Sequence, residues 1–76
     1  MKTVTVLIDT VDKVKNFVDI ITKFEYDFDL VSGRYVIDAK SIMGIFSLDL
    51  SKKLTLSIHT EDECDAVVAA LSPFII

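Results

Sequence analysis

The chain has 76 residues, of which 51% are hydrophobic and 26% are charged, and its formal net charge is −4. A chain of this length forms one small domain, and its hydrophobic fraction excludes an intrinsically disordered protein. The acidic balance, with eight Lys and Arg residues scattered along the sequence, argues against direct binding to nucleic acid.

The first third of the chain predicts a strand followed by a helix. Residues 3–8 alternate in character, with Val4, Val6 and Ile8 on one face, as in a half-buried strand. Asp9 and Thr10 then offer the side chains of helix N-caps. After them, apolar residues recur at spacings of three and four, which predicts an amphipathic helix of about four turns. These residues are Val11, Val14, Phe17, Val18, Ile21 and Phe24.

The middle of the chain predicts a hairpin and a short helix. Residues 26–31 and 34–38 alternate on either side of Ser32-Gly33, a pattern typical of two antiparallel strands joined by a short loop. Ser41 is the expected N-cap of the apolar segment 42–46, in which Gly44 favours only one or two helical turns.

The last third predicts a strand and a final helix. Residues 54–58 alternate between apolar and hydroxyl side chains, and Thr60 and Glu63 have the spacing of a capping box. The apolar stripe of the helix that follows consists of Cys64, Val67, Val68 and Leu71, and Pro73 ends that helix. We expect the apolar residues 74–76 to fold back onto the sheet edge or the helices, or to join a second copy in a homo-oligomer.

These elements predict an α+β fold in two layers. Every expected strand is apolar on one side only, so the helices should cover a single face of an antiparallel sheet. The pattern alone leaves the order of the strands in the sheet open.

The residues that could support catalysis are few. The chain has a single cysteine, Cys64, and a single histidine, His59. These are too few for an intramolecular disulfide or a Cys/His zinc cluster. The two glycines are too few for a phosphate-binding or dinucleotide-binding loop. No apolar stretch has the roughly 18 residues of a membrane span, and the first residues do not resemble a signal peptide. We therefore expect a cytoplasmic protein without a metal, a cofactor or enzymatic activity.

The segment around Ser41 is the strongest candidate for a functional surface. A short helix buries only about half of its side chains, so some of Ile42, Met43 and Phe46 should form an exposed apolar patch next to Lys40. The alternative is that all of them cover the end of the core, and the pattern favours neither interpretation.

The string Ala-Lys-Ser-Ile-Met-Gly, residues 39–44, resembles the regulatory-serine segment of HPr, the phosphocarrier of the bacterial phosphoenolpyruvate-dependent sugar phosphotransferase system. The first helix, the hairpin and the acidic start of the last helix are also similar to that family. The resemblance implies a single HPr-like domain over residues 1–76. It also implies an open-faced two-layer sandwich, with a four-stranded antiparallel sheet in the order 1-4-2-3 and three helices on one face.

The resemblance implies a regulatory role for Ser41. In Gram-positive members, HPr kinase/phosphorylase phosphorylates the corresponding serine with ATP, and the product is a corepressor for a LacI-type catabolite regulator. A phosphate on an N-cap serine would face free backbone N–H groups, and the positive charge of Lys40 is next to it in the sequence. As an unmodified N-cap, Ser41 is worth about 1 kcal/mol. The residues expected to contact such partners are Lys40, Ile42, Met43 and Phe46.

The family's other phosphorylation site departs from the pattern. HPr proteins transfer a phosphoryl group on a histidine that precedes the first helix, in a His-x-Arg-Pro motif. Counting back from Ser41, Thr10 takes the place of the histidine, Asp12 that of the arginine and Lys13 that of the proline. Threonine has no nitrogen lone pair, and Asp12 would repel the phosphate. The chain therefore resembles the catabolite-repression branch of the family, which keeps the serine and lacks the histidine.

Two alternatives to a non-carrier regulatory protein stay open. One is a phosphocarrier that uses an atypical acceptor, and the other is an interaction module that is phosphorylated on neither site. His59, directly before Thr60, is expected to be a solvated histidine at a strand end. Cys64 is expected to be a small buried hydrophobic residue of the last helix.

Overall fold

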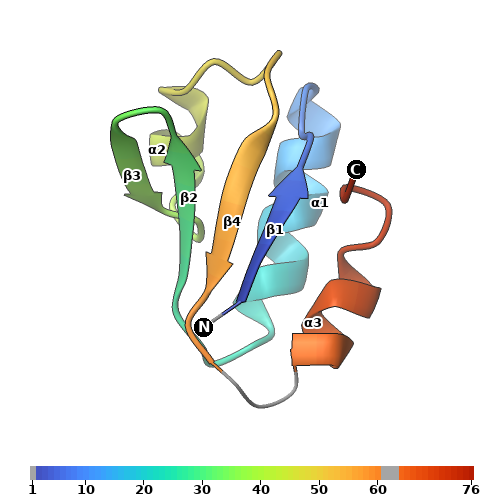
Figure 1. Ribbon diagram of the computed structural model, residues 1–76. Coiled ribbons are helices and arrows are strands. Elements are labelled where there is room, and N and C mark those ends of the chain that lie inside the picture. The colour runs from blue at the N-terminus through green and yellow to red at the C-terminus, as the bar shows by residue number, and fades with distance from the viewer. Residues whose placement is uncertain (1, 61–63) are drawn as a thin grey trace.

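The structure, a computed structural model, describes residues 2–60 and 64–76 and contains four strands and three helices in those ranges (Figure 1). The elements are β1 (Lys2–Val6), α1 (Val11–Thr22), β2 (Phe28–Ser32), β3 (Tyr35–Asp38), α2 (Ile42–Phe46), β4 (Leu54–Ile58) and α3 (Cys64–Ala70). Their order along the chain confirms the predicted α+β arrangement.

The four strands form one antiparallel sheet in the order β1-β4-β2-β3. The register aligns Leu56 of β4 with Val4 on one side and with Leu30 on the other. The order that the alternating pattern left open is therefore the one that the resemblance to HPr implied.

A single core lies between the sheet and the helices. Buried side chains from the strands and from all three helices belong to one cluster, so the helices cover one face of the sheet. In Figure 1, α1 and α2 lie behind the sheet. The largest fully buried side chains stabilise the fold by about 1.5–3 kcal/mol each. They are Phe17, Phe28, Ile8, Ile21, Leu30, Ile45, Leu54, Leu56, Ile58, Leu71, Val6 and Val14.

The opposite face of the sheet is open and mostly polar. Thr3, Ser57 and Asp29 occupy aligned positions on three neighbouring strands of this face. These residues alternate with the buried ones of β1, β2 and β4, and Val31 and Val36, paired on β2 and β3, are apolar exceptions on the open face.

Some element boundaries and one predicted burial differ from the sequence prediction, and β2 occupies Phe28–Ser32 rather than residues 26–31. The predicted strand reached Ile8, but β1 ends at Val6. Ile8 is fully buried although it lies beyond the last residue that pairs with β4. α1 ends at Thr22, and Phe24 packs on the core from the turn that follows. Val11 was expected in the buried stripe of α1, but it is 54% exposed because the first residue of the helix lies outside its buried face.

The hairpin closes through a two-residue loop. Ser32 pairs with Tyr35, so Gly33 and Arg34 make the connection. Gly33 has a φ of 59°, a conformation that residues with a Cβ adopt only with strain. The Ser32-Gly33 signal thus marks the turn, as predicted.

The C-terminal residues run along the free edge of β1, which confirms that they fold back. The backbone N–H of Leu7 donates to the Phe74 carbonyl at 2.8 Å, and that of Ile76 donates to the Thr5 carbonyl at 3.1 Å. The Phe74 ring is buried and meets Phe17 edge to face, with ring centroids 5.9 Å apart.

Two sequence expectations concern the start of α3. Glu63 of the expected capping box lies outside the described residues. Cys64 is half-buried rather than fully buried, and its Sγ donates to the Thr60 carbonyl at 3.0 Å. Among residues 2–60 and 64–76, no helix is long and apolar enough to cross a membrane.

Candidate functional site: the starts of α1 and α2

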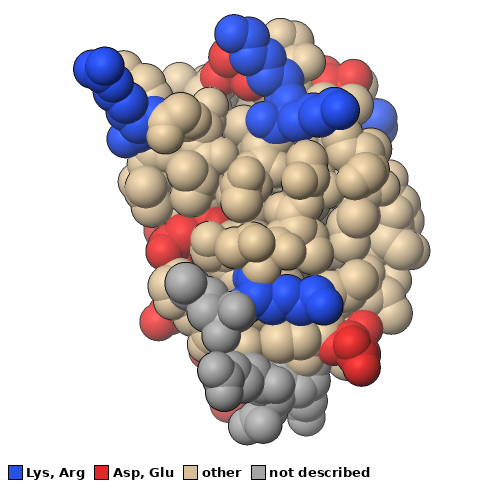
Figure 2. All heavy atoms as spheres, viewed as in Figure 1, with Lys and Arg blue, Asp and Glu red and all other residues tan. Residues whose placement is uncertain are grey.

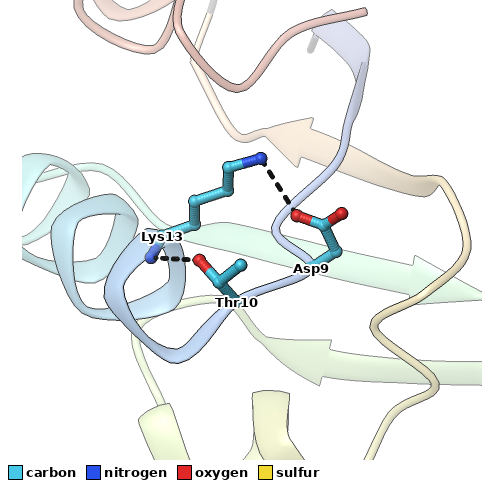
Figure 3. Close-up of polar contacts among 3 residues, drawn as sticks. All are labelled: Asp9, Thr10 and Lys13. Atoms are coloured by element: carbon cyan, nitrogen blue, oxygen red, sulfur yellow. Dashed lines mark hydrogen bonds and ion pairs between the residues drawn. The ribbon is translucent and has the colours of Figure 1, made fainter.

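Thr10 caps the first helix (Figure 3). Its Oγ1 accepts a hydrogen bond from the backbone N–H of Lys13 at 3.1 Å. The Lys13 Nζ reaches back to Asp9 Oδ1 at 3.0 Å, so the two side chains form an ion pair across the helix start. Thr10 and Asp12 are both exposed.

The charge at this helix start is set by Asp9 and Asp12. The hydrogen bond from the Lys13 ammonium, together with its positive charge, lowers the pKa of the Asp9 carboxyl below its ordinary value of 3.8. Asp9 is therefore ionised at neutral pH. Acidic side chains flank Thr10 on both sides in the sequence, and the Lys13 ammonium is already paired with one of them.

His59 lies at the other end of the sheet from Thr10. The register pairs Ile58 with Lys2, whereas Val6, the last residue before the connection to α1, pairs with Leu54 (Figure 1). The sole imidazole of the chain is therefore remote from the start of α1.

The expected solvated histidine has a partner that the sequence did not reveal. His59 Nε2 lies 2.7 Å from Asp29 Oδ2, and the His59 side chain is 39% exposed. The two residues are 30 positions apart in the chain. Alternation places Asp29 on the open face of β2, but only the β2–β4 register brings it next to His59.

Ser41 is an exposed N-cap, as predicted. Its Oγ accepts a hydrogen bond from the Gly44 backbone N–H at 3.2 Å. A Cβ at Gly44 would lie 3.3 Å from that oxygen and 3.4 Å from Ile37 Cδ1, so glycine permits the close approach of the cap to the helix. The hydroxyl stands at the protein surface before a helix of five residues.

Lys40 has contacts within the domain that the sequence did not reveal. Its Nζ donates to the Phe24 carbonyl at 2.8 Å and lies 5.5 Å from the centroid of the Phe28 ring. Lys40 is half-buried, and its ammonium ties the segment before α2 to the residues after α1. The expected contact of Lys40 with a phosphate on Ser41 or with a partner protein stays a prediction.

The apolar residues of α2 divide between surface and core. Met43 is 78% exposed and Phe46 is 41% exposed, whereas Ile45 is fully buried. Ile42, expected in the exposed patch, packs partly against the core. The exposed patch therefore consists of Met43 and Phe46, and we refer to these two residues as the α2 patch.

A sequence model described as the PTS HPr component phosphorylation site matches residues 12–76. The chain belongs to the HPr family. Members of this family are phosphocarrier proteins of the sugar phosphotransferase system, and they act through contacts with other proteins. The matched residues begin at Asp12, two positions after Thr10.

Solved structures agree with this assignment. HPr-C-His from Thermoanaerobacter tengcongensis is 30% identical with a TM-score of 0.79, and the match covers 96% of this chain and 89% of that one. The phosphocarrier protein HPr from Bacillus anthracis is 22% identical with a TM-score of 0.73, over 99% of this chain and 94% of that one. The histidine-containing phosphocarrier protein of Mycoplasma is 13% identical with a TM-score of 0.75, over 95% and 89%. The last two similarities concern the fold alone.

Proposed function

We propose that this protein is an HPr-like regulatory protein that does not transfer a phosphoryl group through a histidine. The observation that supports this proposal is the chemistry before α1. By the spacing back from Ser41, Thr10 takes the place of the carrier histidine, and its hydroxyl serves as the N-cap of the helix. A neutral hydroxyl of this kind lacks the lone-pair nitrogen that accepts the phosphoryl group in the histidine-containing members.

The electrostatics around Thr10 also oppose phosphorylation there. A phosphate brings a charge of about −1.5 to −2 at neutral pH. Asp9 and Asp12 are neighbours in the sequence, and Asp9 holds the Lys13 ammonium in an ion pair. A phosphate on Thr10 would have to compete with Asp9 for Lys13 and would be repelled by both carboxylates.

His59 is the only imidazole that could replace the missing acceptor. Its Nε2 is already paired with Asp29 at 2.7 Å, at the opposite end of the sheet from α1. A partner that docks at the start of α1 would therefore not meet this ring. For this reason we propose the regulatory protein rather than a phosphocarrier with an atypical acceptor.

Ser41 is the residue that we assign to regulation. It is exposed, and its Oγ makes one hydrogen bond, to the Gly44 N–H, which leaves the oxygen accessible to a kinase. The proposed partners are HPr kinase/phosphorylase, which would modify Ser41, and a LacI-type catabolite regulator, which would bind the modified form. The adjacent α2 patch, Met43 and Phe46, offers the apolar contact.

The assignment of Ser41 is tested by incubation with purified HPr kinase/phosphorylase and ATP, followed by mass spectrometry of the peptides. We expect one phosphate, on Ser41, in the wild-type protein. Ser41→Ala should abolish it, whereas Ser47→Ala, at the other end of α2, should retain it. An unmodified protein under conditions that label a control HPr would contradict the serine switch. It would leave the interaction module as the better description.

A further inference from the structure

A pocket opens between the tip of the hairpin and the loop that joins α2 to β4. Its volume is about 610 Å³, within the usual range for small-molecule sites. Arg34 and Tyr35 form one wall, and Leu48 and Asp49 form part of the other. The pocket is separate in sequence from both Thr10 and Ser41, so the proposed function does not use it.

The pocket gathers positive charge on an acidic protein. Three of the eight Lys and Arg residues line it, namely Arg34, Lys52 and Lys53, whereas the chain as a whole has a net charge of −4. Figure 2 shows Lys and Arg side chains along the upper edge of the open face, near the hairpin turn and the loop that leads into β4. A concave wall with one sign of charge concentrates ligands of the other sign.

These cations are available for a ligand. Within residues 2–60 and 64–76, Arg34 and Lys53 make no ion pair. Lys52 lies 3.9 Å from Asp49, but both side chains are more than half exposed, and such a pair is weak. A phosphate that entered the pocket would therefore displace water rather than a strong internal partner.

The acceptors on the opposite wall are largely occupied. Asp49 Oδ1 accepts hydrogen bonds from the Ser51 N–H at 3.2 Å and from the Ser51 Oγ at 2.6 Å. These bonds occupy one oxygen of the Asp49 carboxylate and lower its pKa, so the group stays negatively charged; its other oxygen lies 3.9 Å from the Lys52 ammonium, which offsets that charge in part.

The hairpin wall also offers an aromatic surface. Tyr35 is 70% exposed, and it lies on the same side of β3 as Ile37, which packs against the core. Its ring is therefore available beside the three cations, with apolar atoms of Ile37 and Leu48 in the same pocket. This combination suits a ligand that has an anionic part and a flat ring.

We propose that this pocket binds a small phosphorylated molecule with at least two negative charges and an aromatic ring, of the class of a nucleoside diphosphate. The Arg34 guanidinium provides a planar pair of donors for one phosphate. Lys52 and Lys53 neutralise the remaining charge, and the base stacks on Tyr35.

The test is a titration of the wild-type protein with ADP, followed by amide chemical shifts and by calorimetry at low salt. We expect a submillimolar Kd, with shifts centred on residues 32–37 and 47–53. The double variant Arg34→Gln/Lys53→Gln should weaken ADP binding about tenfold or more. The matched control Lys15→Gln/Lys23→Gln removes the same charge from α1 and its end, and it should change the affinity less than about twofold.

A second comparison separates the ring from the phosphates. Tyr35→Leu should weaken ADP binding and leave the weaker binding of inorganic pyrophosphate unchanged. Thermal unfolding of each variant establishes that it is folded. The proposal would be overturned if both double variants lost the same ADP affinity, or if about 5 mM ADP changed no amide chemical shift in the pocket. It would also be overturned if a Glu-rich peptide bound more tightly than ADP. The last outcome would assign the pocket to an acidic protein segment.

Discussion

Thr10, the residue that precedes α1, is central to the proposed function. Thr10 supplies an oxygen that accepts the Lys13 N–H, and this is all that the helix requires of its N-cap. Phosphoryl transfer requires more, namely a nucleophilic nitrogen and positive charge around it. The helix start can therefore keep its structure under the loss of carrier chemistry that we propose.

The ion pair beside Thr10 gives a prediction about pH. Because Lys13 lowers the pKa of Asp9, the pair stabilises the folded protein above pH 3.8, and this contribution is lost as the pH falls through the lower folded value. Lys13→Gln should raise the Asp9 pKa towards 3.8, measured by NMR titration of the side-chain carboxyl. Lys15→Gln, on the same helix, should leave it unchanged. An Asp9 pKa at or above 3.8 in the wild-type protein would contradict the ion pair.

The α2 patch gives a prediction about binding. Met43→Asp should weaken the complex between the Ser41-phosphorylated protein and a LacI-type regulator about tenfold or more, because it places a charge in an apolar contact. The free energy of unfolding should hardly change, since Met43 is 78% exposed. Val36→Asp, at a residue 63% exposed on β3, is the control and should bind normally. Unchanged binding of the Met43 variant, measured by calorimetry, would remove the patch from the proposed interface.

Sequence reasoning found the caps but not the long-range partners. Thr10 and Ser41 are hydroxyl residues directly before apolar runs, and their capping bonds stay within three residues of the chain. The Lys40 to Phe24 bond and the His59 to Asp29 contact join different elements. Such contacts depend on the packing of helix and sheet, which a local pattern does not contain.

At the scale of elements, the C-terminal segment completes the sheet edge. Its backbone bonds to Thr5 and Leu7 cover an edge of β1 that would otherwise be free to pair with another chain. The Phe74 ring adds apolar contact with α1 through Phe17. Phe74 thus belongs to the core, and the residues after it cover the edge of β1.

Removal of the Phe74 ring should therefore destabilise the protein. We predict that Phe74→Ala lowers the free energy of unfolding by about 3–4 kcal/mol, because it leaves a cavity under α1. Ile76→Ala, at a residue that is 58% exposed, should change it by less than about 0.5 kcal/mol. Urea unfolding of both variants measures the difference. A loss for Phe74→Ala as small as that expected for Ile76→Ala would show that the Phe74 ring contributes little to the core.

Most elements could be predicted from periodicity, and their ends could not. The alternation of residues 54–58 coincides with β4 because both the burial and the ladder stop at Ile58. At β1 burial and strand pairing end at different residues, since Ile8 is buried although the pairing with β4 stops at Val6. The pocket beside Arg34 was missed for a related reason. Its cations come from two loops that only the packed fold brings together.

At the scale of the whole molecule, the fold separates the sites that could accept a phosphate. Thr10 and His59 lie at opposite ends of the sheet, and Ser41 precedes a different helix. The sheet order β1-β4-β2-β3 with helices on one face is retained. The proposed loss of carrier activity is therefore a change of a few surface residues on an unchanged HPr fold.

Phosphorylation with phosphoenolpyruvate and the first enzyme of the phosphotransferase system tests this proposal most directly. A histidine-containing HPr serves as the control, and mass spectrometry locates any phosphate. We predict that the control becomes phosphorylated while this protein remains unmodified. A phosphate on Thr10 or His59 under the same conditions would contradict the loss of carrier activity.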